Sequence, residues 1–120
     1  HVAWKVDKHL PYVSSPLFYD GRVYTIKNGG LASCYDAKTG AQHYQAERMD
    51  ASGDYYSSAV AADGRIYVAS QRGTVVVIAA GDALKVLARN DLREPIFATP
   101  AIIDGRLYLR TEKHLFVFGQ

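Results

Sequence analysis

The tripeptide Asp-Gly-Arg occurs three times in this chain of 120 residues, beginning at Asp20, Asp63 and Asp104. Each copy is followed by an apolar residue and a tyrosine, and the copies lie 43 and 41 residues apart. A short motif of small residues precedes each copy, at residues 14–16, 57–59 and 98–100. Matched elements in a fixed order at a near-constant spacing indicate an internal repeat, and a repeat of about 40 residues requires each unit to form the same supersecondary structure.

Each unit has the pattern of four short β-strands, because apolar residues alternate and β-branched and aromatic side chains dominate. The Asp-Gly pair provides the positive φ angles of a tight hairpin turn between the first two strands. Four-stranded antiparallel units that repeat every 40 residues or so are typical of the blades of a β-propeller, so we predict an all-β fold without helices. In the first unit we expect strands at about residues 14–19, 22–27, 30–35 and 41–47.

The third unit reaches its third strand at residues 115–118, just before the sequence ends. Its missing fourth strand has a counterpart at the other end, where Trp4 takes the position of Tyr44 and Leu87. The chain does not begin with Met, so we expect a processed or trimmed product. We predict one unit of three four-stranded blades over residues 1–120, composed of a fourth strand at 1–7, blades at 14–48 and 57–90, and a partial blade at 97–120.

Three blades do not close a propeller, which needs about four to eight. Either the chain is a fragment of a longer propeller, or copies of it complete one another. The strand at residues 1–7 is in phase to complete the partial blade of a second copy. We therefore predict a homodimer with strand exchange, in which each chain is half of a six-bladed propeller and the two-fold axis lies along the channel.

Composition excludes several classes of protein. The net charge is only +2 and its signs alternate, so no stripe of cations is available for nucleic acid. The longest apolar run, residues 74–80, is far shorter than the roughly 20 residues of a transmembrane span. One cysteine, Cys34, excludes a disulfide framework or a cysteine-based zinc site within one chain. We expect Cys34 to be a small core residue rather than a nucleophile.

Function is expected on the face of the propeller where the loops from fourth to first strands and from second to third strands meet. The loop at residues 47–56 is the least regular segment and gathers carboxylates and tyrosines, which can bind a metal ion, a sugar or a cationic peptide. The candidate ligand-binding residues on this channel face are Tyr12, Asp50, Asp54, Tyr55, Tyr56, Arg93 and Glu94, and the candidates for a metal are His9, Asp50 and Asp54.

A purely structural alternative stays open for these residues: Asp50 and Asp54 are then solvated turn residues, and Tyr55 packs between blades. The tyrosines that follow the tripeptide are expected to be structural, and its arginines to be solvated on the opposite face. These six residues are Tyr24, Tyr67, Tyr108, Arg22, Arg65 and Arg106.

Several motifs resemble the pyrroloquinoline-quinone-like (PQQ-like) β-propeller repeat, an architecture similar to WD40 propellers. They are Ser-Ser-Pro at residues 14–16, Asp-Gly-Arg-Val-Tyr at 20–24, Tyr-Asp-Ala-Lys-Thr-Gly at 35–40 and the aromatic Tyr44. The same repeat occurs in quinoprotein dehydrogenases and in the lipoprotein of the outer-membrane β-barrel assembly machinery. The resemblance implies a propeller fold and a location in the bacterial periplasm or elsewhere outside the cytoplasm.

The quinoprotein motif runs Ala-x-Asp-x-x-Thr-Gly-x-x-x-Trp, and its Trp locks neighbouring blades. Here Tyr44 stands in the Trp position, and the second unit keeps none of the Asp, Thr or Gly. Those enzymes also stack the quinone under adjacent cysteines, which Cys34 alone does not provide. We therefore expect neither PQQ nor dehydrogenase activity and predict no cofactor, while a bound metal stays open.

Two functions are compatible with these residues. The first is a non-catalytic binding or scaffold module that holds an unidentified ligand or protein partner on the channel face of the homodimer. The alternative is a promiscuous hydrolase or lyase, with or without a metal, whose site lies at the channel mouth between subunits. Its acid, base or ligand residues would be Asp50, Asp54, Glu94 and a histidine.

Overall fold

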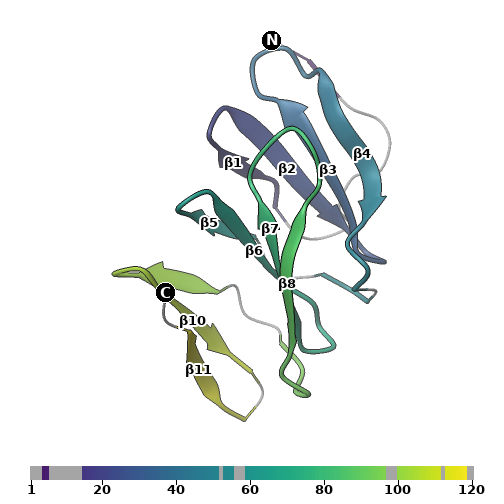
Figure 1. Ribbon diagram of the computed structural model, residues 1–120. Helices are drawn as coiled ribbons and strands as arrows, with labels where there is room; N and C mark the ends of the chain where they lie inside the picture. The colour runs from purple at the N-terminus through teal and green to yellow at the C-terminus, as the bar shows by residue number, and fades with distance from the viewer. Residues whose placement is uncertain are drawn as a thin grey trace.

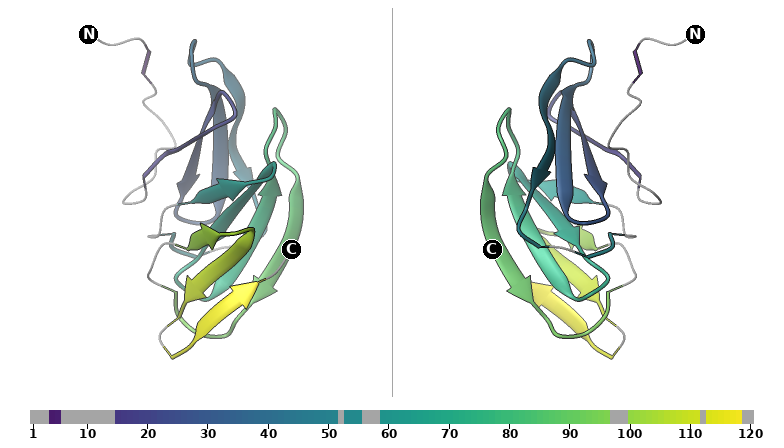
Figure 2. Two further views of the ribbon diagram at one scale, coloured as in Figure 1. Left: turned by 90° about the vertical axis from the view of Figure 1, so that its left-hand side faces the viewer. Right: turned by 90° about the vertical axis from the view of Figure 1, so that its right-hand side faces the viewer.

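The computed structural model describes residues 4–5, 15–51, 53–55, 59–96, 100–111 and 113–118. Three antiparallel sheets follow one another along these residues and fan out as consecutive blades (Figures 1 and 2). Blade 1 contains β1 (Leu17–Tyr19), β2 (Arg22–Lys27), β3 (Leu31–Asp36) and β4 (Gln42–Arg48). Blade 2 contains β5 (Val60–Ala62), β6 (Arg65–Ala69), β7 (Thr74–Ala79) and β8 (Val86–Asp91). Blade 3 contains β9 (Ala101–Ile103), β10 (Arg106–Arg110) and β11 (Leu115–Phe118).

The all-β prediction and the antiparallel blades are confirmed, and the strands are paired in chain order within each sheet. No helix long and apolar enough to cross a membrane occurs among the residues described. Blade 3 has three strands in the described part of the chain, with β11 at its edge. Of the strand predicted at residues 1–7, only Trp4 and Lys5 are described.

The three Asp-Gly turns form as predicted. Asp20 and Gly21 have φ angles of 52° and 72°, and their flanking residues Tyr19 and Arg22 are paired across the hairpin. Two central residues with positive φ define the type I′ turn, whose twist matches that of the strands it joins. Asp63 and Asp104 begin the equivalent turns of blades 2 and 3, with φ angles of 53° and 50°.

Side chains alternate across each strand, so blade 2 has one face toward blade 1 and the other toward blade 3. Between blades 1 and 2, the buried cluster includes Tyr24 and Ile26 from one side and Ile66 and Val68 from the other. A second cluster joins blades 2 and 3 through residues such as Ala69 and Leu109, with Tyr67 packed against it. The Tyr24 hydroxyl also accepts a hydrogen bond of 3.0 Å from the Gly81 amide of the next blade, which confirms a structural role for this tyrosine.

Trp4 docks on the turn between β3 and β4. Its indole Nε1–H donates to the Ala37 carbonyl at 3.0 Å, and its ring centroid lies 6.1 Å from that of Tyr35. Asp36 holds the turn by accepting bonds from the Lys38 and Thr39 amides, which lower the pKa of its carboxyl. Trp4 thus touches blade 1 as the fourth strand of a preceding blade would.

Gly40 provides a test of this docking. It has a φ of 76°, and a Cβ there would lie 2.5 Å from the Trp4 ring. Gly21 has a similar φ of 72° but nothing within 4 Å of an added Cβ. We expect Gly40→Ala to lower the urea midpoint more than Gly21→Ala, which carries only the backbone cost of about 1 kcal/mol.

In a Trp4→Ala background the two substitutions should cost the same, because the ring that Gly40→Ala displaces is gone. Equal costs in the wild-type background would contradict the docking of Trp4 on this turn.

Candidate functional site

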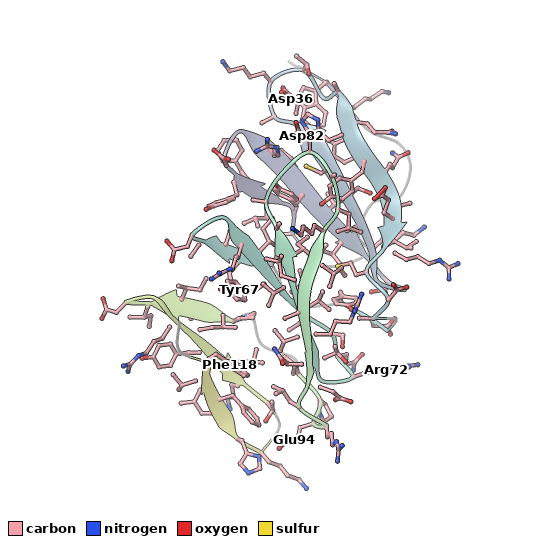
Figure 3. All side chains as sticks on the ribbon, viewed as in Figure 1. Asp36, Tyr67, Arg72, Asp82, Glu94 and Phe118 are labelled. Atoms are coloured by element: carbon pink, nitrogen blue, oxygen red, sulfur yellow. The ribbon has the colours of Figure 1, made fainter. Side chains whose placement is uncertain are left out.

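One end of the fan, which we call the loop face, carries the turns at residues 28–30 and 70–73, the turn closed by the bond from Thr111 N–H to His114 O, and the described parts of the loops that connect consecutive blades. Main-chain hydrogen bonds join its parts: Gly29 N–H to Gly53 O at 2.8 Å, Gln71 N–H to Asp54 O at 2.7 Å, and Ile96 N–H to Gln71 O at 3.1 Å. The first bond ties the turn of blade 1 to the loop that enters blade 2, and the other two tie the turn of blade 2 to the loops before and after that blade. Figure 3 shows Arg72 and Glu94 at this end and Asp36 and Asp82 at the opposite end.

Tyr55 anchors the loop between β4 and β5. Its side chain is 1% exposed, its amide donates to Asn28 Oδ1 at 2.8 Å, and its hydroxyl donates to the Ala51 carbonyl. Burial raises the pKa of the phenol to about 12, so it stays protonated at neutral pH. Tyr55 therefore packs between blades, as the structural alternative has it, and does not present its ring on the surface.

The two aspartates of this loop are exposed. Asp50 has a φ of 57°, and its carboxylate lies 3.6 Å from Arg89 Nη2, while Arg89 Nε–H donates to the Met49 carbonyl. No group of three or more metal-ligating side chains occurs among the residues that the structure describes. Three further candidates lie outside those residues, namely His9, Tyr12 and Tyr56.

Glu94 has the densest set of contacts on the loop face. Its Oε1 accepts a hydrogen bond from the Thr111 hydroxyl at 2.7 Å and one from the Lys113 amide at 3.3 Å. Its Oε2 lies 2.5 Å from Nδ1 of His114, and the Glu94 side chain is only 18% exposed. The Thr111 hydroxyl, followed by His114, lowers the pKa of Glu94, so the carboxylate is charged at neutral pH.

Backbone packing fixes the place of Glu94. The Gly73 amide lies against it so closely that a Cβ on Gly73 would clash with the Glu94 carbonyl oxygen. Leu92 N–H donates to Gly73 O at 2.9 Å, which holds the loop after β8 against the turn of its own blade. Arg93, with a φ of 60°, donates its amide to Asp91 Oδ1 and leaves its side chain exposed.

Thr111 and His114 were not predicted as partners of Glu94. They lie 17 and 20 residues away in the sequence, without a local motif that links them to it. The repeat was the signal that could have indicated these contacts. It places the loop that follows the fourth strand of one blade beside the turn between the second and third strands of the next blade.

The opposite face contains a polar depression of about 460 Å³ that spans blades 1 and 2. Arg22 Nε–H donates to Asp82 Oδ1 at 2.7 Å, Arg22 Nη1 lies 3.2 Å from Asp20 Oδ2, and the Arg22 side chain is 23% exposed. The side chain of Arg22 is therefore partly solvated and also paired, because the β7–β8 turn of the next blade brings Asp82 within reach. Arg65 and Arg106 are exposed, as predicted.

Cys34 is confirmed as a core residue. It is fully buried, and burial raises the pKa of its thiol to about 11. The reactive thiolate is therefore scarce at neutral pH, which makes Cys34 a poor nucleophile.

The lowered pKa of Glu94 predicts a pH-dependent contribution to stability. A carboxyl whose pKa is lower in the folded than in the unfolded state stabilises the fold above its unfolded pKa, near 4.3, and loses that contribution as the pH falls through the folded value. Glu94→Gln should therefore lower the urea midpoint at pH 7, and the difference from wild type should shrink below about pH 4.5.

Glu47→Gln, at an exposed position on β4, is the control for the loss of one surface carboxylate. A difference between Glu94→Gln and wild type that stays constant down to pH 3 or so would contradict the assignment.

Solved structures of similar fold cover most of this chain. BamB from Moraxella catarrhalis is 20% identical with a TM-score of 0.67, and the match covers 86% of this chain and 32% of that one. The computationally designed Ika8 protein is 14% identical with a TM-score of 0.68, covering 88% and 32%. The quinohemoprotein alcohol dehydrogenase ADHIIG from Pseudomonas putida HK5 is 19% identical with a TM-score of 0.66, covering 88% and 17%.

The chain thus spans a third or less of the length of these three structures, and at such identities the likeness concerns the fold. No curated protein matches the sequence. A family model does match residues 50–118, and its description is "Outer membrane protein assembly factor BamB". Because that match spans more than half of the 120 residues, the chain belongs to this family of PQQ-like β-propeller repeats.

Proposed function

We propose that this chain is a non-catalytic binding or scaffold module that holds a protein partner on its loop face. The observation that carries the proposal is the chain of main-chain hydrogen bonds across that face, from Gly29 through Gln71 to Ile96. These bonds tie the turns of blades 1 and 2 to the loops that connect the blades, and the bridge between Ile96 and Thr111 extends the connection to blade 3. Charged side chains such as Asp50 and Arg93 stay exposed on this surface. A fixed surface of this kind binds without the entropic cost of ordering its loops.

Two further points favour binding over catalysis. The Cys34 thiol is buried, and the described residues gather no three metal-ligating side chains. The matching family is described as an outer membrane protein assembly factor, which favours a partner protein over a small substrate. The hydrolase or lyase alternative has one observation in its favour, the short contact between His114 Nδ1 and Glu94, because a carboxylate orients a histidine in many general bases.

A footprint tests the binding role. We expect a peptide selected from a random library of about 12-residue chains to protect amides on the loop face from hydrogen–deuterium exchange, at residues 70–73, 92–96 and 111–114. The Asp-Gly turns at residues 20–21, 63–64 and 104–105 lie at the opposite end and are the internal control. Protection confined to those turns would exclude the loop face as the binding surface.

Metal analysis of the purified protein distinguishes the metal-dependent enzyme from the binding module. Zinc, copper or calcium bound at one ion per chain or per dimer would favour the metal-dependent enzyme.

We further propose that a second copy completes the ring. Within the described residues β11 is paired only with β10, and Leu115 and Val117 on it are 66% and 48% exposed. A groove of about 360 Å³ lies between blades 2 and 3, bordered by Tyr67, Leu87 and Phe118. Figure 3 labels Tyr67 and Phe118. An unpaired apolar edge favours the addition of a strand, and the segment around Trp4 is in phase to supply it.

Light scattering coupled to size-exclusion chromatography tests this completion. We expect a mass of twice 13.2 kDa for the wild-type chain and loss of the dimer on deletion of Val2–Val6. Lys5→Ala is the matched control, because it changes the same segment without removing the strand. A stable wild-type monomer would exclude the homodimer and leave a longer propeller as the explanation.

A further inference from the structure

Blades 1 and 3 each have an outer face, which points away from blade 2, and these two faces carry most of the exposed apolar side chains. Of the five large apolar residues that are exposed in the described part of the chain, four lie on an outer face. Phe18 on β1 is 68% exposed and Ile103 on β9 is 55% exposed, and Leu115 and Val117 share the face of Ile103. Figure 1 shows the two blades at opposite ends of the fan, so a single chain leaves the outer faces apart.

The alternation of side chains along each first strand shows which way these residues point. Leu17 packs against the cluster between blades 1 and 2, so Phe18, the next residue, points away from blade 2. Ile102 packs against the cluster between blades 2 and 3, so its neighbours Ala101 and Ile103 point away from blade 2. Phe18 therefore faces the place of a preceding blade, and Ala101 and Ile103 face the place of a following blade.

The two joints inside the chain show how the sizes of facing residues are related. At the joint between blades 1 and 2, the large Leu17 of the first blade lies in the same cluster as the small Ala61 of the next blade. At the joint between blades 2 and 3, the equivalent positions are Val60 and Ile102. The residue on the earlier blade has become smaller and the residue on the later blade larger. Such compensation keeps a core filled without voids or clashes.

The outer faces extend this series. Blade 3 has Ala101 at the position that points to a following blade, and blade 1 has Phe18 at the position that points to a preceding blade. The smallest residue of one set thus matches the largest residue of the other set. Trp4 lies against Tyr35 on the same outer face as Phe18, so the segment proposed to complete a partner's blade 3 borders this position.

We propose that the outer face of blade 1 packs on the outer face of blade 3 in a second copy of the chain, with Phe18 seated against the partner subunit's Ala101. This inference rests on the ring completion proposed above and names the side chains that hold it together. A second copy fits better than an unrelated protein, because the series of sizes continues only if a blade 1 follows blade 3. A two-fold axis makes two such contacts in each dimer, since every copy offers one face of each kind.

Changes in the size of the two residues test the contact, with the dissociation constant of the dimer measured by native mass spectrometry over a dilution series of the full chain. We expect Phe18→Ala to weaken the dimer about 100-fold, because it leaves a cavity in both contacts. Ala101→Phe should weaken it as well, because two rings then occupy the space of one. Leu87→Ala is the matched control, since it removes an exposed apolar side chain that lies on neither outer face, and it should leave the dimer unchanged.

A mixture of the two variants makes the test specific to this pair of residues. In a mixed dimer each contact again has one phenylalanine and one alanine, so the Phe18→Ala and Ala101→Phe chains should pair with each other more tightly than either pairs with itself. A Phe18→Ala dimer as tight as wild type, or a mixed dimer no tighter than its components, would overturn this packing and leave the strand-completed dimer standing. A monomeric wild-type chain would overturn both, whereas the loop-face footprint tests the binding function independently. Both residues are exposed in the single chain, so the variants are expected to fold, which circular dichroism checks.

Discussion

Each blade of this protein has apolar side chains on both faces of its sheet, so both faces need a neighbour. Blade 2 satisfies this requirement, with Ile66 and Val68 in one cluster and Ala69 and Leu109 forming the other with blade 3. The repeat length, the hairpin turns and the order of the strands all serve this stacking. Burying apolar surface stabilises a fold by roughly 25 cal/mol per Å². Because a single sheet leaves its apolar faces in water, the stack of blades, and not one sheet, is the stable unit.

Stacking occupies the faces of the strands and leaves the connecting loops for binding. On the loop face, the same loops are held twice, by main-chain bonds between blades and by the carboxylate of Glu94 between two loops. The opposite face is held by side-chain ion pairs, as between Arg22 and Asp82. The pair between Arg22 and Asp82 occupies both side chains, whereas a main-chain bond between two loops leaves the side chains of the bonded residues available to a partner.

The sequence was informative where one residue type is required by local geometry. The Asp20–Gly21 turn was predictable because few residues adopt two consecutive positive φ angles, and the position of Trp4 was predictable because the repeat aligns it with Tyr44. Contacts between side chains distant in the chain were not predictable. Arg22 meets Asp82 across 60 residues and Glu94 meets His114 across 20, and neither pair recurs in the other units. A repeat predicts the structure at positions that its copies share. Each of these two contacts involves a position at which the copies differ.

Trp4, Tyr44 and Leu87 occupy equivalent positions, yet they hold the following blade unequally. Trp4 contacts its turn and donates a hydrogen bond to it, the buried Tyr44 has a hydroxyl without a hydrogen-bond partner among the described residues, and Leu87 is 44% exposed. The joints between blades therefore form a graded series from firm to weak. The contact between blades 2 and 3 is the less buried of the two at this position, so we expect thermal fluctuation to open it before the contact between blades 1 and 2.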